Sequence, residues 1–332
     1  MTVSRVLNGR GNVAEETQIA VRRAVEELGY EPNRNAQHLA GGRDQRTIAI
    51  LLGGLDFDVT LHKVADIQHR LSARGYNVPL HTLGALVPSQ KNEQTALARE
   101  IRRQRPRALI CKFGALSEDA QEEVRRYHSE GGLVISFNEP ADLECDQVLF
   151  DREDNTYQAA RYLLELGHRD LGFWASDISV WTTEPRIQGF RRALREFGVP
   201  ERPQWQFSGG SHLENERSGA ELAAQLLALP QRPTGLCMVN DSAAVMCVGE
   251  LMRGGLRVPD DISVVSHDDL PIAHYGAVPL TAVSHPIEAT ARAIVEMLCQ
   301  RIEDGFDGPP RRLTLRGELH VRHSTAPPPT PP

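Results

Sequence analysis

The spacing of apolar residues along the chain changes near residue 47. The segment 15–28 carries apolar side chains at helical spacing, which predicts an amphipathic helix. These side chains are Ile19, Val21, Ala24, Val25 and Leu28. From residue 47 the sequence "TIAILL" is almost continuously apolar, which is typical of a strand that is buried on both faces of a parallel sheet.

Strand and helix patterns then alternate in two successive series, one over 47–150 and one from 151 onward. The first series has strands at 47–52, 77–80, 108–111, 133–137 and 148–150 and helices at 64–74, 91–103 and 117–130. The second has helices at 154–166, 185–197, 215–228, 241–254 and 286–303 and strands at 171–175, 205–207, 235–239, 262–267 and 311–319. Two such series predict an α/β fold with two doubly wound parallel-sheet lobes.

Composition limits the classes of protein to which the chain can belong. Of its 332 residues, 40% are hydrophobic and 24% are charged, and the net charge is −7. A globular chain with this charge can bind nucleic acid only through a local patch. The five cysteines form no CxxC pair or Cys/His cluster, so we expect reduced, buried thiols, with no metal site and no cofactor. No signal peptide or membrane-length apolar run is found, which predicts a cytoplasmic protein.

Two short polar segments flank the helix predicted at 15–28. The first, "TVSRVLN" at 2–8, has helical character and is ended by glycines at 9 and 11. The second, "NRNAQHLA" at 33–40, contains one large apolar side chain, Leu39. On the residues alone, a solvated N-terminal helix and an ordinary linker are the plainer interpretation.

Longer motifs resemble the LacI/GalR family of bacterial transcription regulators. "TVSRVLN" is similar to the recognition helix of that family, and "TQIAVRRAVEELGYEPNRNAQHLAGG" is similar to its third helix and hinge. "LLELGHRDLGFW", "MVNDSAAVMCVGELMRGGLRVPDDISVVSHDD" and "PLTAVSHPIEATARA" are similar to landmarks of its regulatory core, and "HVRHSTAPP" is similar to its end. The resemblance covers essentially the whole chain except the first helix of the family.

The resemblance implies a domain organisation. A partial helix-turn-helix headpiece is expected at 1–30, a hinge at 31–46, a periplasmic-binding-protein-like core at 47–322 and a disordered tail at 323–332. Within the core, we expect the first lobe at about 47–150 plus a crossover near 281–286, and the second at about 151–280 and 287–322. Because a short helix without a packing partner is unstable in water, we expect the chain as numbered to bind DNA weakly or not at all and a version extended upstream to bind it well.

The headpiece and hinge supply the candidate DNA contacts. In a helix-turn-helix the second helix lies in the major groove, where Arg5 can contact guanine O6 and N7 and Thr2 and Ser4 can reach phosphates or bases. Asn8 ends this helix and can contact phosphate. The resemblance further implies that the hinge lies in the minor groove of a palindromic site, with Leu39 wedged at its centre. The side chains expected along the groove walls are Asn33, Arg34, Ala36 and Gln37.

Polar residues that follow strand ends are the candidate effector ligands, because ligands of doubly wound sheets bind beyond the carboxyl ends of the strands. Asp151, Asn240 and Asp268 each follow a predicted strand, and Arg186 lies at the start of a predicted helix. The resemblance implies that Arg186, Asn240 and Asp268 hold sugar hydroxyls, since such groups can bridge two vicinal hydroxyls. The further candidates are Trp181, as a stacking surface, and Asp56 and Phe57, in the loop after the first strand.

Each candidate has a structural alternative. Asn240 can cap the helix that follows it, and the pair Asp268-Asp269 can serve as a helix cap or in salt bridges. Trp181 can be a core or surface residue, and His267 can line the site or be an interior histidine whose ring nitrogens are satisfied.

Three positions depart from the family pattern. The loop "GGLDFDV" lacks the usual Asn-Pro-Phe, Glu184 stands where a second arginine is frequent, and Ser266-His267 replaces a glycine and an aromatic residue. The acidic residues Asp56, Asp58 and Glu184 favour a neutral sugar or polyol over a phosphorylated effector.

These observations predict a homodimeric DNA-binding transcriptional repressor that a small sugar or polyol controls. An enzyme is disfavoured, because the sequence has no nucleophile elbow, no GxGxxG after a strand, no P-loop and no metal-ligand spacing. A periplasmic-type sugar-binding protein shares the two-lobe fold but not the segment 1–40. A cytoplasmic sugar sensor that lacks DNA binding because of the truncated headpiece stays open as the alternative.

Overall fold

The computed structural model describes residues 14–27, 44–53, 58–83, 91–175, 180–209 and 215–329. By internal contacts the chain forms two units, Met1–Gln45 and Arg46–Pro332, and each is described by itself. Within the part of the first unit that the structure describes, α2 (Glu15–Glu27) confirms the helix predicted at 15–28. The segments 2–8 and 33–40, which hold all the predicted DNA contacts, lie outside the described residues.

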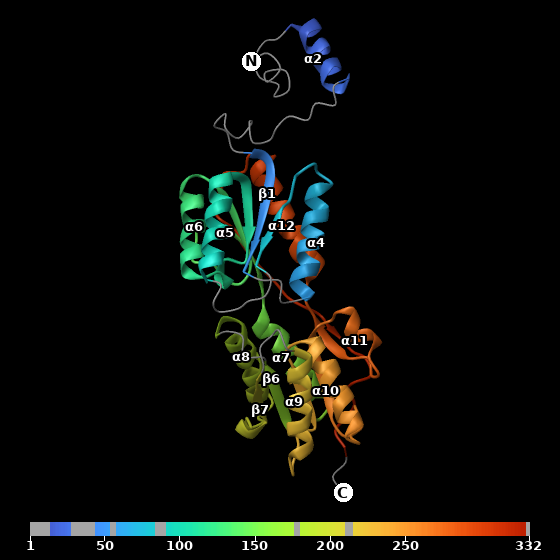
Figure 1. The fold of residues 1–332 in the computed structure, drawn as a ribbon. Coiled ribbons are helices and arrows are strands. Elements are labelled where there is room, and N and C mark those ends of the chain that lie inside the picture. The colour runs from blue at the N-terminus through green and yellow to red at the C-terminus, as the bar shows by residue number, and fades with distance from the viewer. Residues whose placement is uncertain are drawn as a thin grey trace. The chain divides into compact units, whose positions relative to one another are not determined.

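The second unit contains two six-stranded sheets (Figure 1). The first sheet has the order β11-β5-β4-β3-β1-β2. Its strands are β1 (Asp44–Leu52), β2 (Leu80–Thr82), β3 (Pro106–Cys111), β4 (Leu133–Asn138), β5 (Asp146–Phe150) and β11 (Arg312–Leu315). Its helices are α4 (Asp58–Ser72), α5 (Lys91–Gln104), α6 (Glu118–Ser129) and α12 (Ile287–Ile302). We call this sheet with its helices the first lobe.

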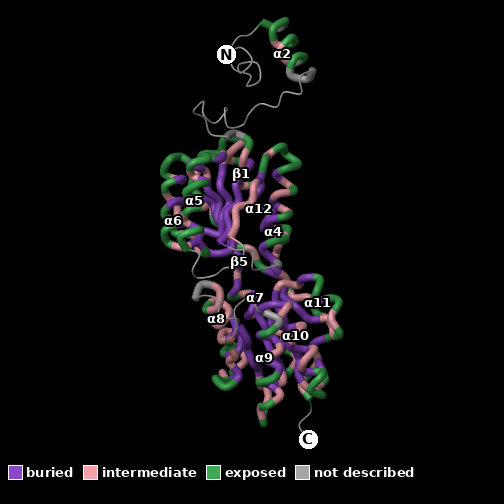
Figure 2. Tube along the Cα trace, viewed as in Figure 1, coloured by how far each residue is buried: buried purple, intermediate pink, exposed green. Residues whose placement is uncertain are grey.

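The helices around strand β1 explain why its sequence is continuously apolar. Successive side chains of a strand point to opposite faces of the sheet, and here both faces are covered. Ile48, Ile50 and Leu52 pack with α4 and α12, while Ala49 and Leu51 pack with α5 and α6. The buried strands therefore lie between two layers of helices whose outer faces are exposed (Figure 2).

The second sheet has the order β12-β10-β9-β8-β6-β7. Its strands are β6 (Leu171–Ala175), β7 (Gln206–Ser208), β8 (Gly235–Met238), β9 (Ser263–Asp268), β10 (Thr281–Ser284) and β12 (Leu319–His320). Its helices are α7 (Arg152–Glu165), α8 (Val180–Glu196), α9 (Asn215–Ala228), α10 (Asp241–Arg253) and α11 (Pro271–Tyr275). We call this the second lobe. Together the two sheets confirm the predicted α/β fold with two doubly wound lobes.

The chain crosses between the two lobes three times, from β5 to α7, from β10 to α12 and from β11 to β12. This differs from the predicted division, which placed 281–286 in the first lobe and 287–322 in the second. Strand β10 pairs with β9 in the second sheet, whereas α12 packs on the first sheet and β11 pairs with β5. The single strand predicted at 311–319 is thus two strands in different sheets. An apolar stripe shows that a helix is covered, but it does not show which of two similar sheets covers it.

Hydrogen bonds join the three crossings to one another. The buried side chain of Asn155 donates to the Ser284 carbonyl oxygen over 3.2 Å and accepts from the Gly317 backbone over 3.1 Å. Asn155 itself lies in the first turn of α7, directly after the first crossing, so its side-chain amide connects all three crossings. Gly317 is required here, because an added Cβ would lie 1.9 Å from the Ser284 carbonyl oxygen.

The segment after β12 differs from the predicted disordered tail at 323–332. Ser324 is fully buried, and its hydroxyl donates to the Val264 carbonyl oxygen over 2.6 Å and accepts from the Thr281 amide over 2.8 Å. The Ala326 carbonyl oxygen lies 2.9 Å from His168 Nε2. The proline-rich composition suggested disorder, but the polar residues before the prolines pair with buried backbone groups of the second lobe. Residues 330–332 lie outside the described part of the chain.

A buried carboxylate, that of Asp146 in β5, attaches the last segments of the first lobe. Asp146 is 1% exposed and accepts hydrogen bonds of 2.8 Å from the side chains of Arg301 in α12 and of Arg311 before β11. Burial by itself raises the pKa of this carboxyl group, but the hydrogen bonds from Arg301 and Arg311 outweigh burial and lower the pKa to about 2.

We expect Asp146→Asn to lower the free energy of unfolding at pH 7 by about 2–3 kcal/mol, below the roughly 3–5 kcal/mol of a fully buried pair because both arginines are partly exposed. The folded pKa lies below the unfolded value, so the carboxylate contributes stability that is present above about pH 4 and is lost as the pH falls toward 2. Urea unfolding at pH 7 and pH 3 should therefore show a smaller difference between wild type and variant at pH 3. Glu122→Gln, in a half-exposed pair with Arg126, is the control; an Asp146 effect that is the same at both pH values contradicts the assignment.

Two glycines in helices of the second lobe give a second prediction. A Cβ at Gly219 in α9 would lie 2.2 Å from the Ala243 carbonyl oxygen of α10, whereas one at Gly249 would meet only the end of the Arg253 side chain at 3.8 Å. We expect Gly219→Ala to destabilise the protein by about 1–3 kcal/mol through overpacking. Gly249→Ala should stabilise it by about 0.5–1 kcal/mol, because alanine favours the helix. Calorimetric melting of both variants checks this, and a Gly219→Ala melting temperature at or above that of wild type would show that the helices do not pack this closely.

Candidate functional site

Three residues at the carboxyl ends of strands adopt the left-handed backbone region. Asn138 ends β4 with a φ of 71°, Asp268 ends β9 with a φ of 101°, and Asp269 follows with a φ of 58°. This region is unfavourable for residues other than glycine, and residues held in it are common at ligand sites. Asn138 lies at the carboxyl edge of the first sheet, and Asp268 and Asp269 lie at that of the second. Ligands of doubly wound sheets bind beyond such edges.

Six charged side chains interact electrostatically around these strand ends, and we call them the charged cluster. The pKa of Arg186 responds to Arg152, Asp268 and Glu139, and the pKa of Lys63 responds to Arg152, Glu139, Lys112 and Asp268. The members are Lys63 of α4, Lys112 after β3, Glu139 after β4, Arg152 at the start of α7, Arg186 of α8 and Asp268 of β9. The charged cluster therefore draws on both lobes and on the first crossing.

Lys63 is the most deeply buried cation of the charged cluster. It is 0% exposed, and its Nζ donates a hydrogen bond of 2.6 Å to the Asn138 side-chain oxygen. The same Nζ lies 5.8 Å from the centre of the Phe150 ring, a cation–π contact. Burial and then the positive charge of Arg152 lower the pKa of Lys63 well below its ordinary value, because no carboxylate in hydrogen-bonding contact compensates it among the described residues.

Arg152, Glu139 and Lys112 form a buried chain of charges. Arg152 donates to the Asn138 carbonyl oxygen over 3.0 Å and to Glu139 Oε1 over 2.9 Å. The same carboxylate oxygen lies 3.8 Å from Lys112 Nζ. All three residues are less than 10% exposed. Because Arg152 begins α7, this chain of charges connects the ends of β3 and β4 to the first crossing.

Arg186 brings a second guanidinium from the second lobe. Its Nη1 donates to the Thr182 carbonyl oxygen one turn earlier in α8, over 2.8 Å. Burial, followed by the charge of Arg152, lowers the pKa of Arg186 to about 9, while Asp268 and Glu139 act in the opposite direction. Both guanidinium groups come from helices of the second lobe, α7 and α8, and they approach closely enough to repel each other.

An aromatic stack lies beside these cations. The rings of Phe150 and His285 are 3.7 Å apart at an angle of 24°. His285 follows β10 at the second crossing, and its backbone amide donates to the Asp268 carbonyl oxygen over 3.0 Å. Burial and the charges of Lys63 and Arg152 lower the pKa of His285 well below its ordinary value, so this imidazole is neutral at pH 7.

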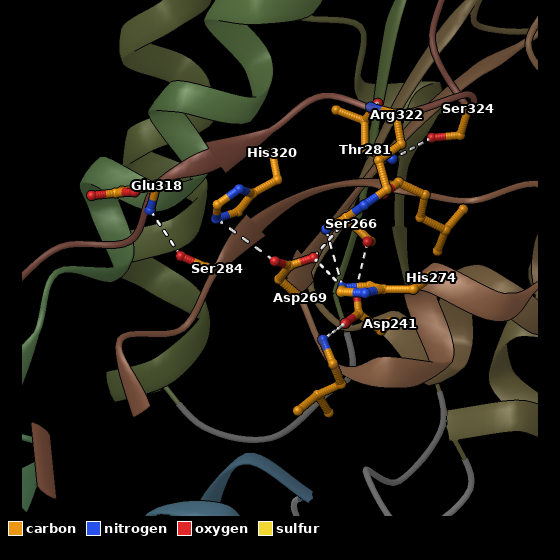
Figure 3. A network of polar contacts seen from close by, with 12 residues as sticks. Asp241, Ser266, Asp269, His274, Thr281, Ser284, Glu318, His320, Arg322 and Ser324 are labelled. Atoms are coloured by element: carbon orange, nitrogen blue, oxygen red, sulfur yellow. Dashed lines mark hydrogen bonds and ion pairs between the residues drawn. The ribbon is translucent and has the colours of Figure 1, made fainter. Parts of the chain in front are cut away.

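Asp241 and Asp269 fix the loop after β9 from two sides (Figure 3). Asp241 accepts hydrogen bonds from the Ser266 hydroxyl over 2.5 Å and from the Leu270 amide over 2.7 Å, while burial and the charge of Asp268 raise its pKa well above the ordinary value. Asp269 pairs with Arg322 Nη1 at 2.6 Å and with His274 and His320 at 3.1 and 3.7 Å. The left-handed turn at Asp268-Asp269 is therefore held by both neighbouring carboxylates.

The predicted effector residues do not all meet at the charged cluster. Arg186 and Asp268 are members of it. Asn240 caps α10 by accepting from the Ala243 amide over 2.7 Å, and Asp151 caps α7 by accepting from the Asp154 amide over 3.0 Å. His267 is an interior histidine, with Nδ1 2.7 Å from the Met238 carbonyl oxygen.

The other predicted side chains fall outside what the structure describes. Asp56 and Phe57 lie in the loop 54–57, and Trp181 lies in α8 with a side chain that is not described. Arg5, Leu39 and the other predicted DNA contacts fall within 1–13 and 28–43.

Sequence reasoning missed five residues of this region, although most carry a signal. Lys112, Glu139 and His285 each directly follow a strand, so the same rule that selected Asp268 would have selected them. Lys63 lies in the buried stripe of α4, spaced four residues from Val59 and Ile67, and a lysine on an apolar stripe indicates a buried charge. Arg152, inside a polar helix start, carries no such signal.

The described residues show neither a metal-binding group nor a membrane-spanning helix. They contain no group of three or more His, Cys, Asp or Glu side chains placed to hold a metal ion, and none of their helices is long and apolar enough to cross a membrane. The five cysteines are buried and free, as predicted.

Known protein families match both the N-terminal segment and the core of the chain. The profile for bacterial regulatory proteins of the lacI family matches residues 1–33, and that for a periplasmic binding protein-like domain matches residues 160–325. The HTH-type transcriptional repressor PurR of Vibrio campbellii is 30% identical over 327 residues, which cover 97% of this chain and 94% of that protein. The PurR repressor of Vibrio vulnificus is also 30% identical, over 97% of this chain and 93% of that protein.

Solved structures of the same architecture cover nearly the whole chain. A complex of the transcriptional regulator CelR with cellobiose matches with a TM-score of 0.71 and 26% identity, over 97% of this chain and 94% of that one. The lac repressor dimer bound to operator and the anti-inducer ONPF matches with a TM-score of 0.78 and 23% identity, over 98% and 94%, which shows a shared fold. The resemblance inferred from the sequence motifs is thereby confirmed, and the chain belongs to the LacI family of bacterial transcriptional regulators, a family of repressors and other regulators and not of enzymes.

Proposed function

We propose that this chain represses transcription as a homodimer on a palindromic operator and is controlled by a small sugar or polyol that binds at the charged cluster. The observation that carries the proposal is the meeting of charges from both lobes at Arg186. Asp268 and Glu139 act on this guanidinium from the second and the first lobe, next to the crossings. A ligand that binds there contacts both lobes at once.

Such a ligand changes the relation between the lobes. If its contacts differ between two lobe arrangements, it favours one of them, and the difference in binding free energy is the coupling available to control DNA binding. The backbone at the crossings is tied together by Asn155, so a change there involves all three crossings. The DNA-reading part would then respond through the segment that precedes β1.

Two kinds of relative support the class of ligand and target. The CelR structure contains cellobiose, and that regulator is 26% identical to this chain. The lacI profile over residues 1–33 supports operator contacts by Thr2, Ser4, Arg5 and Asn8. Within the effector site we retain Arg186 and Asp268, and on the resemblance Asp56, Phe57 and Trp181. Asn240 and Asp151 already serve as helix caps and contribute mainly through local structure.

We expect Arg186→Ala to abolish the effector response and to preserve operator binding. Melting of the full chain is measured with a panel of sugars and polyols that includes cellobiose; a ligand at about one hundred times its Kd stabilises the folded protein by about 2.7 kcal/mol. The variant should lose this shift, whereas Arg195→Ala, an exposed arginine of the same helix, should keep it. Operator binding is followed by anisotropy on a duplex selected from a randomised pool. Loss of both ligand and operator binding in the Arg186 variant would count against its role.

Arg5→Ala should give the opposite result. Loss of a bidentate contact to guanine costs about 1–3 kcal/mol of operator binding and relaxes specificity at that base pair. The variant should keep the sugar-induced melting shift, because Arg5 belongs to the other unit of the chain. Titration of the selected duplex at matched low salt measures the first effect. Failure of the unaltered chain to select any duplex would contradict operator binding by this chain.

A further inference from the structure

The charged cluster has an excess of positive charge. Four of its members are cationic, Lys63, Lys112, Arg152 and Arg186, and the two carboxylates are Glu139 and Asp268. The two carboxylate oxygens of Asp241 accept hydrogen bonds from Ser266 and Leu270, and not from any of the four cations among the described residues. Among the described residues, cationic groups of the cluster therefore outnumber anionic ones by two.

The burial of these cations makes the excess significant. Lys63, Lys112 and Arg152 are 0%, 9% and 8% exposed, so water compensates them poorly. Arg152 and Lys112 share one carboxylate, that of Glu139, and buried cations that outnumber their counter-ions are unfavourable. The lowered pKa values of Lys63 and Arg186 have the same cause. An anion at this position would remove the repulsion and restore the full charge of both groups.

Three polar atoms of the same region have no hydrogen-bond partner among the described residues. Arg152 Nε and Glu139 Oε2 are two of them, and His285 Nδ1 is the third. Each belongs to a side chain that is more than nine-tenths buried. A guanidinium N–H donates to an anionic oxygen, and a carboxylate oxygen accepts from a hydroxyl, so these atoms together match a ligand that offers both groups.

We propose that the effector is a small polyhydroxylated acid, whose carboxylate or phosphate group is held by Lys63, Arg152 and Arg186 and whose hydroxyl donates to Glu139. This inference rests on the proposed function, since it names the ligand class of the same site. His285, neutral and stacked on Phe150, completes the polar wall with Nδ1.

The proposal revises the expectation of a neutral ligand, which rested on Asp56, Asp58 and Glu184. Asp56 lies outside the described residues, and Asp58 begins α4 with a side chain that is not described. Glu184 is exposed and accepts a hydrogen bond from Gln188 one turn along α8. It therefore leaves the excess in the charged cluster unchanged.

The test uses matched acids and neutral sugars on the full chain. Gluconate, glucuronate, galacturonate and ribonate are compared by calorimetric titration with sorbitol, glucose, galactose and ribose, and glucose 6-phosphate and ribose 5-phosphate form a third arm. We expect an acid to bind about tenfold to a hundredfold more tightly than its neutral counterpart, the usual gain of a charge-assisted hydrogen bond. The carboxylate and phosphate arms decide which anionic group is held.

The outcomes separate this inference from the proposed function. Neutral sugars that bind as tightly as their acids overturn the inference and leave the proposed function standing. If no member of any arm binds, both fail. An acid that binds equally well to wild type and to Arg186→Ala contradicts the site, whatever its affinity.

Lys63→Met tests the proposal both by acid affinity and by the melting temperature of the ligand-free protein. Methionine has a similar volume and no charge, so removal of a cation from a positive excess should raise the melting temperature of the free protein and reduce acid affinity at least tenfold. Lys63→Arg should retain the preference for acids, and Lys91→Met, at the exposed start of α5, should change neither quantity. An unchanged acid-to-neutral affinity ratio in Lys63→Met overturns the proposal even if that variant is less stable.

Discussion

The structure depends on the hydrogen bonds that pair backbone groups at the three places where the chain crosses between the two lobes. Asn155 solves this problem with one side chain, because its amide donates to Ser284 on one crossing and accepts from Gly317 on another. The Ser284 amide in turn donates to the Glu318 carbonyl oxygen over 2.8 Å, and the Asp151 amide donates to the Leu315 carbonyl oxygen over 2.9 Å. The three crossings therefore behave as one hydrogen-bonded ribbon. Any change in the relation of the lobes must be absorbed by this ribbon, since both sheets are packed on two faces.

The charged cluster is placed where it can act on that ribbon. Arg152 belongs both to the cluster and to the first turn after the first crossing, and the His285 amide ties the second crossing to Asp268 over 3.0 Å. Repulsion between Lys63 of the first lobe and Arg152 of the second opposes the approach of the lobes. A ligand that neutralises this repulsion changes the free energy of one lobe arrangement relative to another, which is the requirement for control by a small molecule.

Much of this fold follows from the sequence, and the parts that do not have identifiable causes. The apolar run of β1 and the strand–helix alternation predict both sheets, and Asn215–Ala228 is the helix predicted at 215–228. Helix α8 begins at Val180, five residues before the predicted start at 185, and Pro185 lies inside it. The pattern of apolar residues did not determine to which lobe β10, α12 and β11 belong, because each could pack in or on either sheet. At the site, the rule of polar residues after strands found Asp268, whereas Arg186 was placed by resemblance. Lys63 was missed because the predicted helix began at residue 64, whereas α4 begins at Asp58 and includes this lysine in its buried stripe.

Positive excess alone does not identify a ligand site, and two other clusters of this chain show why. Buried Glu123 is surrounded by Arg99, Arg102 and Arg126, but these arginines are 47%, 25% and 55% exposed, so water compensates their charges. Asp146 likewise has two arginines, yet Arg301 also donates to the carbonyl oxygens of Gly308 and Pro309. Arg311 Nε beside Asp146 also lacks a partner among the described residues, but it belongs to a side chain that is 27% exposed. The charged cluster differs in the deeper burial of Lys63, Lys112 and Arg152 and in the unpartnered atoms on both a cation and a carboxylate, Arg152 Nε and Glu139 Oε2. A structural ion-pair network gains stability by satisfying each buried group. A buried network that leaves a donor, an acceptor and a net charge unsatisfied is instead complementary to a ligand of the opposite charge. This distinguishes the charged cluster from the salt bridges of Glu123 and Asp146, which stabilise the first lobe.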